Sequence, residues 1–258
     1  MIPRIVFFDL DNTLAESKQA LTPAMAELLM KLLSHTQVAI TSGGKFEQLI
    51  TQVVSHVWHI CQTCQVSEDA VLSNLHLLPT SGAALYDFKN GRWELQYEEK
   101  LSEDEVAKIT RALEEGAAST ELIDFAHLLH GDYIENRGSQ ISLSALGQEA
   151  PVAEKKEWDP TRSKRETIQK AVAPLLPYFD VKVGGLTTID VTKHGINKAY
   201  GVRMLCEHLS IPISETLYIG DELVNGGNDE VVQETGIPTR AVKDPSETAI
   251  AIHDLLQA

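Results

Sequence analysis

Short apolar runs alternate with segments of helical spacing at both ends of the chain. The runs at residues 5–8, 37–41 and 216–219 are mainly apolar, as expected of strands that are buried in a parallel sheet. The segments 24–33, 46–59 and 197–209 have the spacing of helices and lie between or beside these runs. The pattern predicts an α/β fold with a Rossmann-like parallel-sheet core.

The middle of the chain has a different pattern. It begins with a predicted hairpin around Asn90-Gly91 and a helix that starts at a capping box, 102–105. Short predicted strands at 132–134, 140–143, 181–183 and 188–191 follow, with a helix at 167–176 between them. We therefore predict an α/β core formed by residues 1–84 and 188–258, with an α+β cap domain inserted at 85–187.

Composition limits the classes of partner. The chain has 258 residues, 43% of them hydrophobic, and a formal net charge of −15. The negative charge disfavours nucleic acid and anionic membranes as partners. The sequence has no run of membrane-spanning length and no signal-peptide pattern, and it has three cysteines, which favours a cytoplasmic location.

One group of potential zinc ligands lies close together, at His56, His59, Cys61 and Cys64. A structural zinc site normally needs a second ligand pair, and none is evident elsewhere. The surrounding residues are compatible with a helix. We interpret the four side chains as ordinary helix residues, with zinc as the alternative.

The first predicted strand ends in two acidic residues, Asp9 and Asp11, within the motif Asp-Leu-Asp-Asn-Thr. Open α/β sheets place reactive groups at the carboxyl ends of their strands. Two carboxylates so close repel each other unless a cation lies between them, and Mg²⁺ prefers oxygen ligands. A carboxylate beside Mg²⁺ can attack phosphorus, so the motif predicts phosphoryl transfer.

Other strand and helix ends add polar groups to this predicted site. Ser42 follows the second strand, where its hydroxyl is expected either to bind a phosphoryl oxygen or to cap the next helix; Thr41 is a weaker candidate. Lys198 opens a helix, where the helix dipole disfavours a cation unless an anion is near. Asp221 follows the strand at 216–219, and Asn228-Asp229 completes a Gly-rich acidic loop.

These motifs, in this order, resemble the four motifs of the haloacid dehalogenase superfamily, and the insertion resembles its type IIB cap. Within that branch the chain is most similar to the eukaryotic-type phosphomannomutases. The similarity is carried by residues 81–86 and 89–91 at the entry to the cap, 133–138 and 144–147 in the cap, and 184–191, 195 and 198 on the return. It is carried also by 226–230 in the fourth motif, so it extends over nearly the whole chain.

The resemblance implies a role for each motif residue and a haloacid dehalogenase-like core. Asp9 is the implied nucleophile, Asp11 the general acid and base, and Ser42 and Lys198 the phosphoryl-binding pair. Mg²⁺ is implied to be held by Asp9, the backbone carbonyl of Asp11, and Asp221, with Asn228 and Asp229 in support. The implied substrate-binding residues of the cap are Arg137, Thr188 and Asp190. A cap-to-cap homodimer is also implied.

The cap departs from the mutases at two positions where arginines normally clamp a distal phosphate. Gln148 and Lys155 stand there instead, and neither supplies a bidentate fork. Arg162, Lys164 or Arg165 could compensate, or could belong to a solvated charged stretch. We therefore expect a magnesium-dependent phosphatase of a small sugar phosphate. The alternatives are a phosphomannomutase and a non-catalytic sugar-phosphate sensor.

Overall fold

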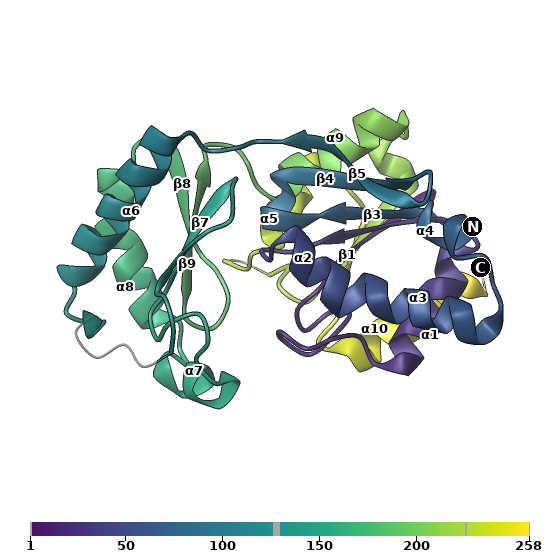
Figure 1. The fold of residues 1–258 in the computed structure, drawn as a ribbon, viewed down its shortest axis with the longest axis horizontal. Coiled ribbons are helices and arrows are strands. Elements are labelled where there is room, and N and C mark those ends of the chain that lie inside the picture. Colours follow the sequence, from purple (N-terminus) through teal and green to yellow (C-terminus); the bar gives the residue numbers. More distant parts are fainter. Residues whose placement is uncertain (1, 126–129, 225, 258) are drawn as a thin grey trace. The chain divides into compact units, whose positions relative to one another are not determined.

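The computed structural model describes residues 2–125, 130–224 and 226–257. Asn225, in the predicted acidic loop, lies outside the described residues. The chain forms two compact units, one of residues 1–98 and 197–258 and the other of residues 99–196 (Figure 1).

The first unit contains a seven-stranded sheet. Its strand order is β11-β10-β1-β2-β3-β4-β5. The pairs from β11 to β3 are parallel, whereas β3–β4 and β4–β5 are antiparallel. The strands are β1 (Ile5–Asp9), β2 (Gln37–Thr41), β3 (Leu75–Leu78), β4 (Ala84–Lys89), β5 (Arg92–Glu98), β10 (Thr216–Gly220) and β11 (Thr239–Ala241).

Helices cover both faces of this sheet, because each central strand is apolar on both sides. Val6 and Phe8 of β1 join the larger core cluster, with α1 (Pro23–Leu33), α3 (Ser55–Cys64) and α10 (Pro245–Leu256). Ile5 and Phe7 point to the other face, where they pack with α9 (Lys198–Leu209). Residues of β1 are therefore buried throughout, as predicted for a central parallel strand.

The remaining elements of the first unit are short. They are α2 (Phe46–Leu49), the π-helical turn η1 (Ile50–Val54), α4 (Glu68–Leu72), α5 (Pro79–Gly82), η4 (Ile213–Glu215) and η5 (Glu230–Thr235).

The second unit is a four-stranded antiparallel sheet with two helices on one face. Its strand order is β6-β7-β9-β8. The apolar residues of β7 and β9, Ile141, Leu143, Ile189 and Val191, pack against α6 and α8. The elements are α6 (Glu103–Ala118), β6 (Ile134–Asn136), β7 (Gln140–Ser144), α7 (Val152–Trp158), α8 (Ser163–Val172), η3 (Ala173–Leu175), β8 (Phe179–Val183) and β9 (Thr188–Lys193).

The structure shifts both predicted domain boundaries. The hairpin β4–β5, predicted to begin the cap, extends the core sheet, because β4 pairs antiparallel with β3 through His76 and Asp87. The strand β9, which the predicted boundary at 188 assigns to the core, pairs with β7 and β8 in the second sheet. The inserted unit is therefore 99–196 rather than 85–187.

The helix predicted at 46–59 extends to Cys64 as α2, η1 and α3. Cys61 is buried in the core and Cys64 is exposed. Among the described residues, the one group of three or more acidic, histidine or cysteine side chains close enough to share a cation lies elsewhere, at Asp9, Asp221 and Asp229. His56, His59, Cys61 and Cys64 all lie within α3. In the described part of the chain, no helix has both the length and the apolar character to cross a membrane.

Candidate active site

The carboxyl ends of three neighbouring strands bring predicted site residues to one edge of the core sheet. β1 lies between β2 and β10, and all three strands are parallel. Asp9 is the last residue of β1 and pairs in register with Thr41 of β2, so Ser42 follows directly beside it. Asp221 comes directly after β10. The strand order therefore assembles three of the motifs.

Lys198 joins these groups from the first turn of α9. Its ammonium is buried and donates to Asp9 Oδ1 at 2.5 Å, to Asn228 Oδ1 at 2.7 Å and to Asp229 Oδ1 at 2.6 Å. Asn197 caps the helix by accepting from the backbone N–H of Tyr200. The three acceptors account for all three N–H groups of the ammonium, and they supply the anions that a lysine at a helix start requires.

Three carboxylates meet in this site. Asp9, Asp221 and Asp229 each offer one oxygen, and these oxygens lie within 4.8 Å of one another. Burial raises the pKa of Asp9 well above its ordinary value, although Lys198 acts in the opposite direction. Burial and the Asp229 charge raise the pKa of Asp221 to about 6. A single ammonium leaves negative charge in excess, and a donor set of hard oxygens fits a divalent cation such as Mg²⁺.

Gly220, the first glycine of the fourth motif, leaves room for the side chain of Asp229. A Cβ atom at Gly220 would lie 2.4 Å from Asp229 Oδ2. Asp229 itself is fully buried, and its Oδ2 accepts from the backbone N–H of Glu222 at 3.3 Å. The bare backbone at Gly220 thus lets the Asp229 carboxylate reach the end of β10.

The side chain of Asp11 does not belong to the acidic cluster. Its Oδ1 accepts from the backbone N–H of Lys18 at 2.5 Å, so it is held on the turn after β1. Asn12 has a φ of 59°, a left-handed conformation that asparagine tolerates better than most residues. Asp229 is therefore the carboxylate that joins Asp9 and Asp221, and only the backbone carbonyl of Asp11 is left as its predicted metal ligand.

Ser42 is buried, and its side chain serves the local turn. Its Oγ accepts from the N–H of Gly44 at 3.0 Å. Its backbone carbonyl accepts from Ser81, which, like Thr80, has a positive φ. Two consecutive left-handed residues cost conformational energy and are retained where the surroundings hold them. The Ser42 hydroxyl, as an acceptor, keeps its own O–H for a phosphoryl oxygen.

Tyr218 is the residue that sequence reasoning missed. Its hydroxyl, from the middle of β10, lies 2.6 Å from Asp229 Oδ1 and 2.9 Å from Thr41 Oγ1. Its side chain is fully buried. The available signal was a tyrosine within a buried apolar strand, where an O–H group requires a partner.

The second unit contains the predicted substrate residues, and two of them share one face of its sheet. In the register of β7 and β9, Ser142 pairs with Asp190 and Ser144 with Thr188. Ser142 Oγ donates to Asp190 Oδ1. Arg137, directly after β6, is nearly buried, and its Nε donates to Glu135 Oε2 at 2.8 Å. Thr188 and Asp190 alternate with Ile189 and Val191, so they lie opposite the face that α6 and α8 cover.

Two cationic side chains of this region, Lys155 and Arg165, are engaged within the second unit, whereas the buried Nε of Arg162 has no hydrogen-bond partner among the described residues. Lys155 is buried, and its ammonium donates to the backbone carbonyl of Gln148 at 2.9 Å. Arg165 donates from Nε to Asp159 Oδ2 at 2.9 Å and from Nη1 to the carbonyls of Gly184 and Gly185. Arg165 therefore stabilises the turn that precedes β9.

A model of the family described as haloacid dehalogenase-like hydrolase matches residues 6–230. The chain belongs to this family. The site described above, at the edge of the sheet where Asp9, Ser42, Lys198 and Asp221 lie, falls within the matched residues.

Curated relatives extend over almost the whole chain. A protein of Caenorhabditis elegans named probable phosphomannomutase is 26% identical, covering 98% of this chain and 95% of its own length. Phosphomannomutase 2 of Dictyostelium discoideum is 23% identical, covering 97% and 95%.

Solved structures share the fold. An IMP-bound IMP-nucleotidase of Plasmodium falciparum has a TM-score of 0.67 at 18% identity, covering 99% of this chain and 68% of its own. A haloacid dehalogenase-like hydrolase of Bacteroides thetaiotaomicron has a TM-score of 0.61 at 14% identity, covering 98% and 99%. At these identities the likeness establishes the fold alone.

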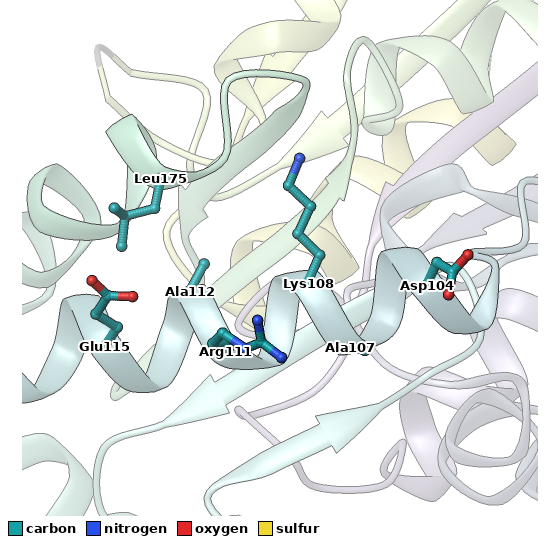
Figure 2. A pocket seen from close by; sticks show the side chains of 7 residues that line it. All are labelled: Asp104, Ala107, Lys108, Arg111, Ala112, Glu115 and Leu175. Atoms are coloured by element: carbon teal, nitrogen blue, oxygen red, sulfur yellow. The ribbon is translucent and has the colours of Figure 1, made fainter.

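A hollow of about 350 Å³ lies along α6 of the second unit, separate from the predicted substrate residues. Figure 2 shows Lys108, Arg111 and Glu115 along this helix, with Leu175 facing it. Neither Arg137, Thr188 nor Asp190 lines the hollow. It is therefore not the substrate pocket that the sequence predicts.

Magnesium is expected to stabilise the protein against heat, and more strongly at pH 7.5 than at pH 5. The Asp221 carboxyl, with its pKa raised to about 6, is largely protonated at the lower pH and cannot bind a cation. At saturating Mg²⁺ and about pH 7.5, we expect the melting temperature to rise by several degrees, since a ligand at about 100 times its Kd adds about 2.7 kcal/mol. Differential scanning calorimetry at both pH values measures this.

Asp221→Asn is the control for this effect. A carboxyl whose folded pKa is raised destabilises the fold once the pH exceeds that pKa. Without cation, the variant should therefore be at least as stable as the parent at pH 7.5, and it should lose most of the magnesium effect. Equal magnesium shifts in parent and variant would contradict the assignment of Asp221.

Proposed function

We propose that this protein is a magnesium-dependent phosphotransferase that acts on a small sugar phosphate through a phosphorylated Asp9. The observation that carries this is the buried contact of Asp9 with the Lys198 ammonium, inside a cluster of three carboxylates at the edge of the sheet. A nucleophilic carboxylate needs a cationic site that can accept a phosphate dianion, and this arrangement supplies one.

The proposed reaction assigns a step to each of these side chains, and Asp11 would leave its contact with the Lys18 N–H to take the role that the family resemblance implies. An Asp9 oxygen attacks phosphorus, the bond from phosphorus to the sugar oxygen breaks, and Asp11 gives its proton to that oxygen. Lys198 exchanges one of its carboxylate contacts for a phosphoryl oxygen, and Ser42 donates its O–H to another. Asp9, Asp221 and the backbone carbonyl of Asp11 would hold Mg²⁺, which would neutralise charge at the phosphoryl group.

The second half of the reaction releases Asp9. Asp11, now a carboxylate, takes a proton from an incoming hydroxyl, whose oxygen attacks phosphorus and breaks the bond to Asp9. The incoming group is water in a phosphatase and a sugar hydroxyl in a mutase. The substrate residues of the second unit, proposed as Arg137, Thr188 and Asp190, are the groups that would hold the sugar.

We favour the mutase, with mannose phosphates as the first substrates to test, because the similarity to proteins named phosphomannomutase covers the whole chain. This reverses the expectation from the cap sequence. The phosphatase stays a second candidate for a specific reason. Gln148 carries no charge, and Lys155 and Arg165 are engaged inside the second unit, which weakens a clamp for a second phosphate.

The products distinguish these candidates. Mannose 1-phosphate is incubated with protein, Mg²⁺ and a catalytic amount of a hexose bisphosphate, and ³¹P NMR follows the mixture. A mutase yields the 6-phosphate without inorganic phosphate and depends on the bisphosphate, whereas a phosphatase releases inorganic phosphate without it. Binding without either product across a panel of sugar phosphates would favour the sensor and contradict the proposal.

Arg137→Ala is expected to reduce kcat/KM for the sugar phosphate by about 10–100-fold, through KM, since a charge-assisted contact to a substrate anion contributes about 1.5–3 kcal/mol. Turnover of a small phosphate ester that lacks the sugar should change little. Arg111→Ala is the matched control, because it removes an arginine from α6, outside the proposed substrate face. Identical kinetics for parent and Arg137→Ala on all sugar phosphates would refute the role of Arg137.

A further inference from the structure

Tyr218 presents its hydroxyl to the acidic cluster from the interior of the sheet. The side chain is fully buried, with its ring stacked on Phe7. A phenol has one proton, and the 2.6 Å contact to a carboxylate oxygen identifies Asp229 as its acceptor. Thr41 Oγ1 has one proton, and the Phe8 carbonyl at 3.2 Å and the phenol oxygen at 2.9 Å are its two possible acceptors.

This contact completes the hydrogen bonding of Asp229. Its Oδ1 accepts from both the Lys198 ammonium, at 2.6 Å, and the Tyr218 hydroxyl. Its Oδ2 accepts from the Glu222 N–H and lies against Gly220. The two donors occupy both lone pairs of Oδ1, so a cation could reach Asp229 only through Oδ2, although Asp229 lies close enough to Asp9 and Asp221 to share one.

We infer that Tyr218 is a positioning residue that keeps Asp229 as the counter-ion of Lys198 and outside the coordination shell of the cation. The inference rests on the proposed function for its effect on turnover. Without the hydroxyl, Asp229 Oδ1 keeps one donor and has a lone pair in a buried cluster already rich in carboxylates. It then turns toward the cation and loosens its hold on Lys198, which disturbs phosphoryl transfer.

Tyr218→Phe tests the inference because it removes one oxygen atom and leaves the ring. Mn²⁺ serves as the probe in the absence of substrate, because electron paramagnetic resonance measures its binding directly. We expect Tyr218→Phe to bind Mn²⁺ about 5–10-fold more tightly, since a third carboxylate becomes available. We expect kcat to fall about 10–100-fold while KM changes less than about twofold.

Tyr97→Phe is the matched control. Tyr97 lies in the same unit, and its hydroxyl donates to the Gly82 carbonyl at 2.8 Å, outside the acidic cluster. It should leave Mn²⁺ affinity and kcat unchanged. A merely structural role for Tyr218 predicts that both tyrosine variants lose stability and that neither binds Mn²⁺ more tightly, so tighter binding is the outcome specific to the inference.

An unchanged or weaker Mn²⁺ affinity in Tyr218→Phe overturns the inference. If that variant does not fold, Asp229→Asn decides. A loss of less than about tenfold in Mn²⁺ affinity supports Asp229 as a counter-ion, and any larger loss makes it a ligand and overturns the inference. Absence of turnover in the parent protein would refute the proposed function, while the Mn²⁺ titration would still decide the role of Tyr218.

Discussion

Asp9→Asn is expected to abolish turnover of every phosphate ester that the parent converts, by about 10⁴-fold or more. An amide is a poor nucleophile toward phosphorus, so no phosphorylated protein can form at this position. The fold should persist, because the amide oxygen still accepts from Lys198. Asp229 stays as a buried carboxylate partner of Lys198, so the ammonium is not left without a counter-charge.

Intact-protein mass spectrometry after an acid quench separates this loss from a general failure of the site. The parent should gain the mass of one phosphoryl group during turnover, and Asp9→Asn should gain none. Asp11→Asn is the comparison: it keeps the nucleophile but cannot activate the incoming hydroxyl, so it should accumulate the adduct from a substrate with a good leaving group. A phosphoryl adduct on Asp9→Asn would exclude Asp9 as the nucleophile.

Most of the core of this site could be predicted because parallel sheets obey a simple rule. Short apolar strands followed by polar residues must deliver those residues to one edge when the strands are parallel neighbours. Asp9, Ser42 and Asp221 follow that rule, and the order β10-β1-β2 brings them together. Lys198 could be found because a buried cation at a helix start requires anions nearby. The local pattern was sufficient for each of these residues.

The boundary of the inserted unit could not be predicted in the same way. A hairpin with Asn90-Gly91 at its turn forms whether it extends a parallel sheet or begins a new one. What decides is the pairing of β4 with β3, a contact of the tertiary structure. The strand β9 lies close in sequence to the core helix α9, so sequence proximity favoured the core, whereas its register with β7 and β8 places it in the second sheet.

Two details of the acidic cluster depend on side-chain direction, which sequence spacing does not give. Asp11 lies in the turn after β1 and Asp229 lies directly before η5, yet only the side chain of Asp229 joins Asp9 and Asp221. The turn after β1 holds Asp11 on the Lys18 N–H. From the sequence alone, Tyr218 cannot be distinguished from an ordinary core residue of a strand; its role depends on the position of Asp229.

Lys198→Met is expected to cause the second large loss, in stability as well as in turnover. The Lys198 ammonium forms buried ion pairs with Asp9 and Asp229. Removing one partner of a buried ion pair costs about 3–5 kcal/mol of folding stability. Burial lowers the pKa of the Lys198 ammonium, but the charges of Asp229 and Asp9 outweigh this and raise it. The parent therefore keeps this cation over the accessible pH range. Turnover should fall about 10²–10³-fold with the loss of a preorganised donor.

The pH dependence of unfolding identifies the cause of that loss. Without the ammonium, Asp9 lies buried without its cationic partner, and burial already raises its pKa, so the folded variant loses stability as the pH rises. Urea unfolding should thus show a small deficit relative to the parent near pH 5 and a large one near pH 8. Lys198→Met combined with Asp229→Asn should recover stability at pH 8, since no unpaired charge remains at Asp229, but not turnover. If the variant's free energy of unfolding is lower than the parent's by the same amount at every pH, Lys198 contributes packing rather than charge. Only an uncompensated carboxylate makes this difference depend on pH.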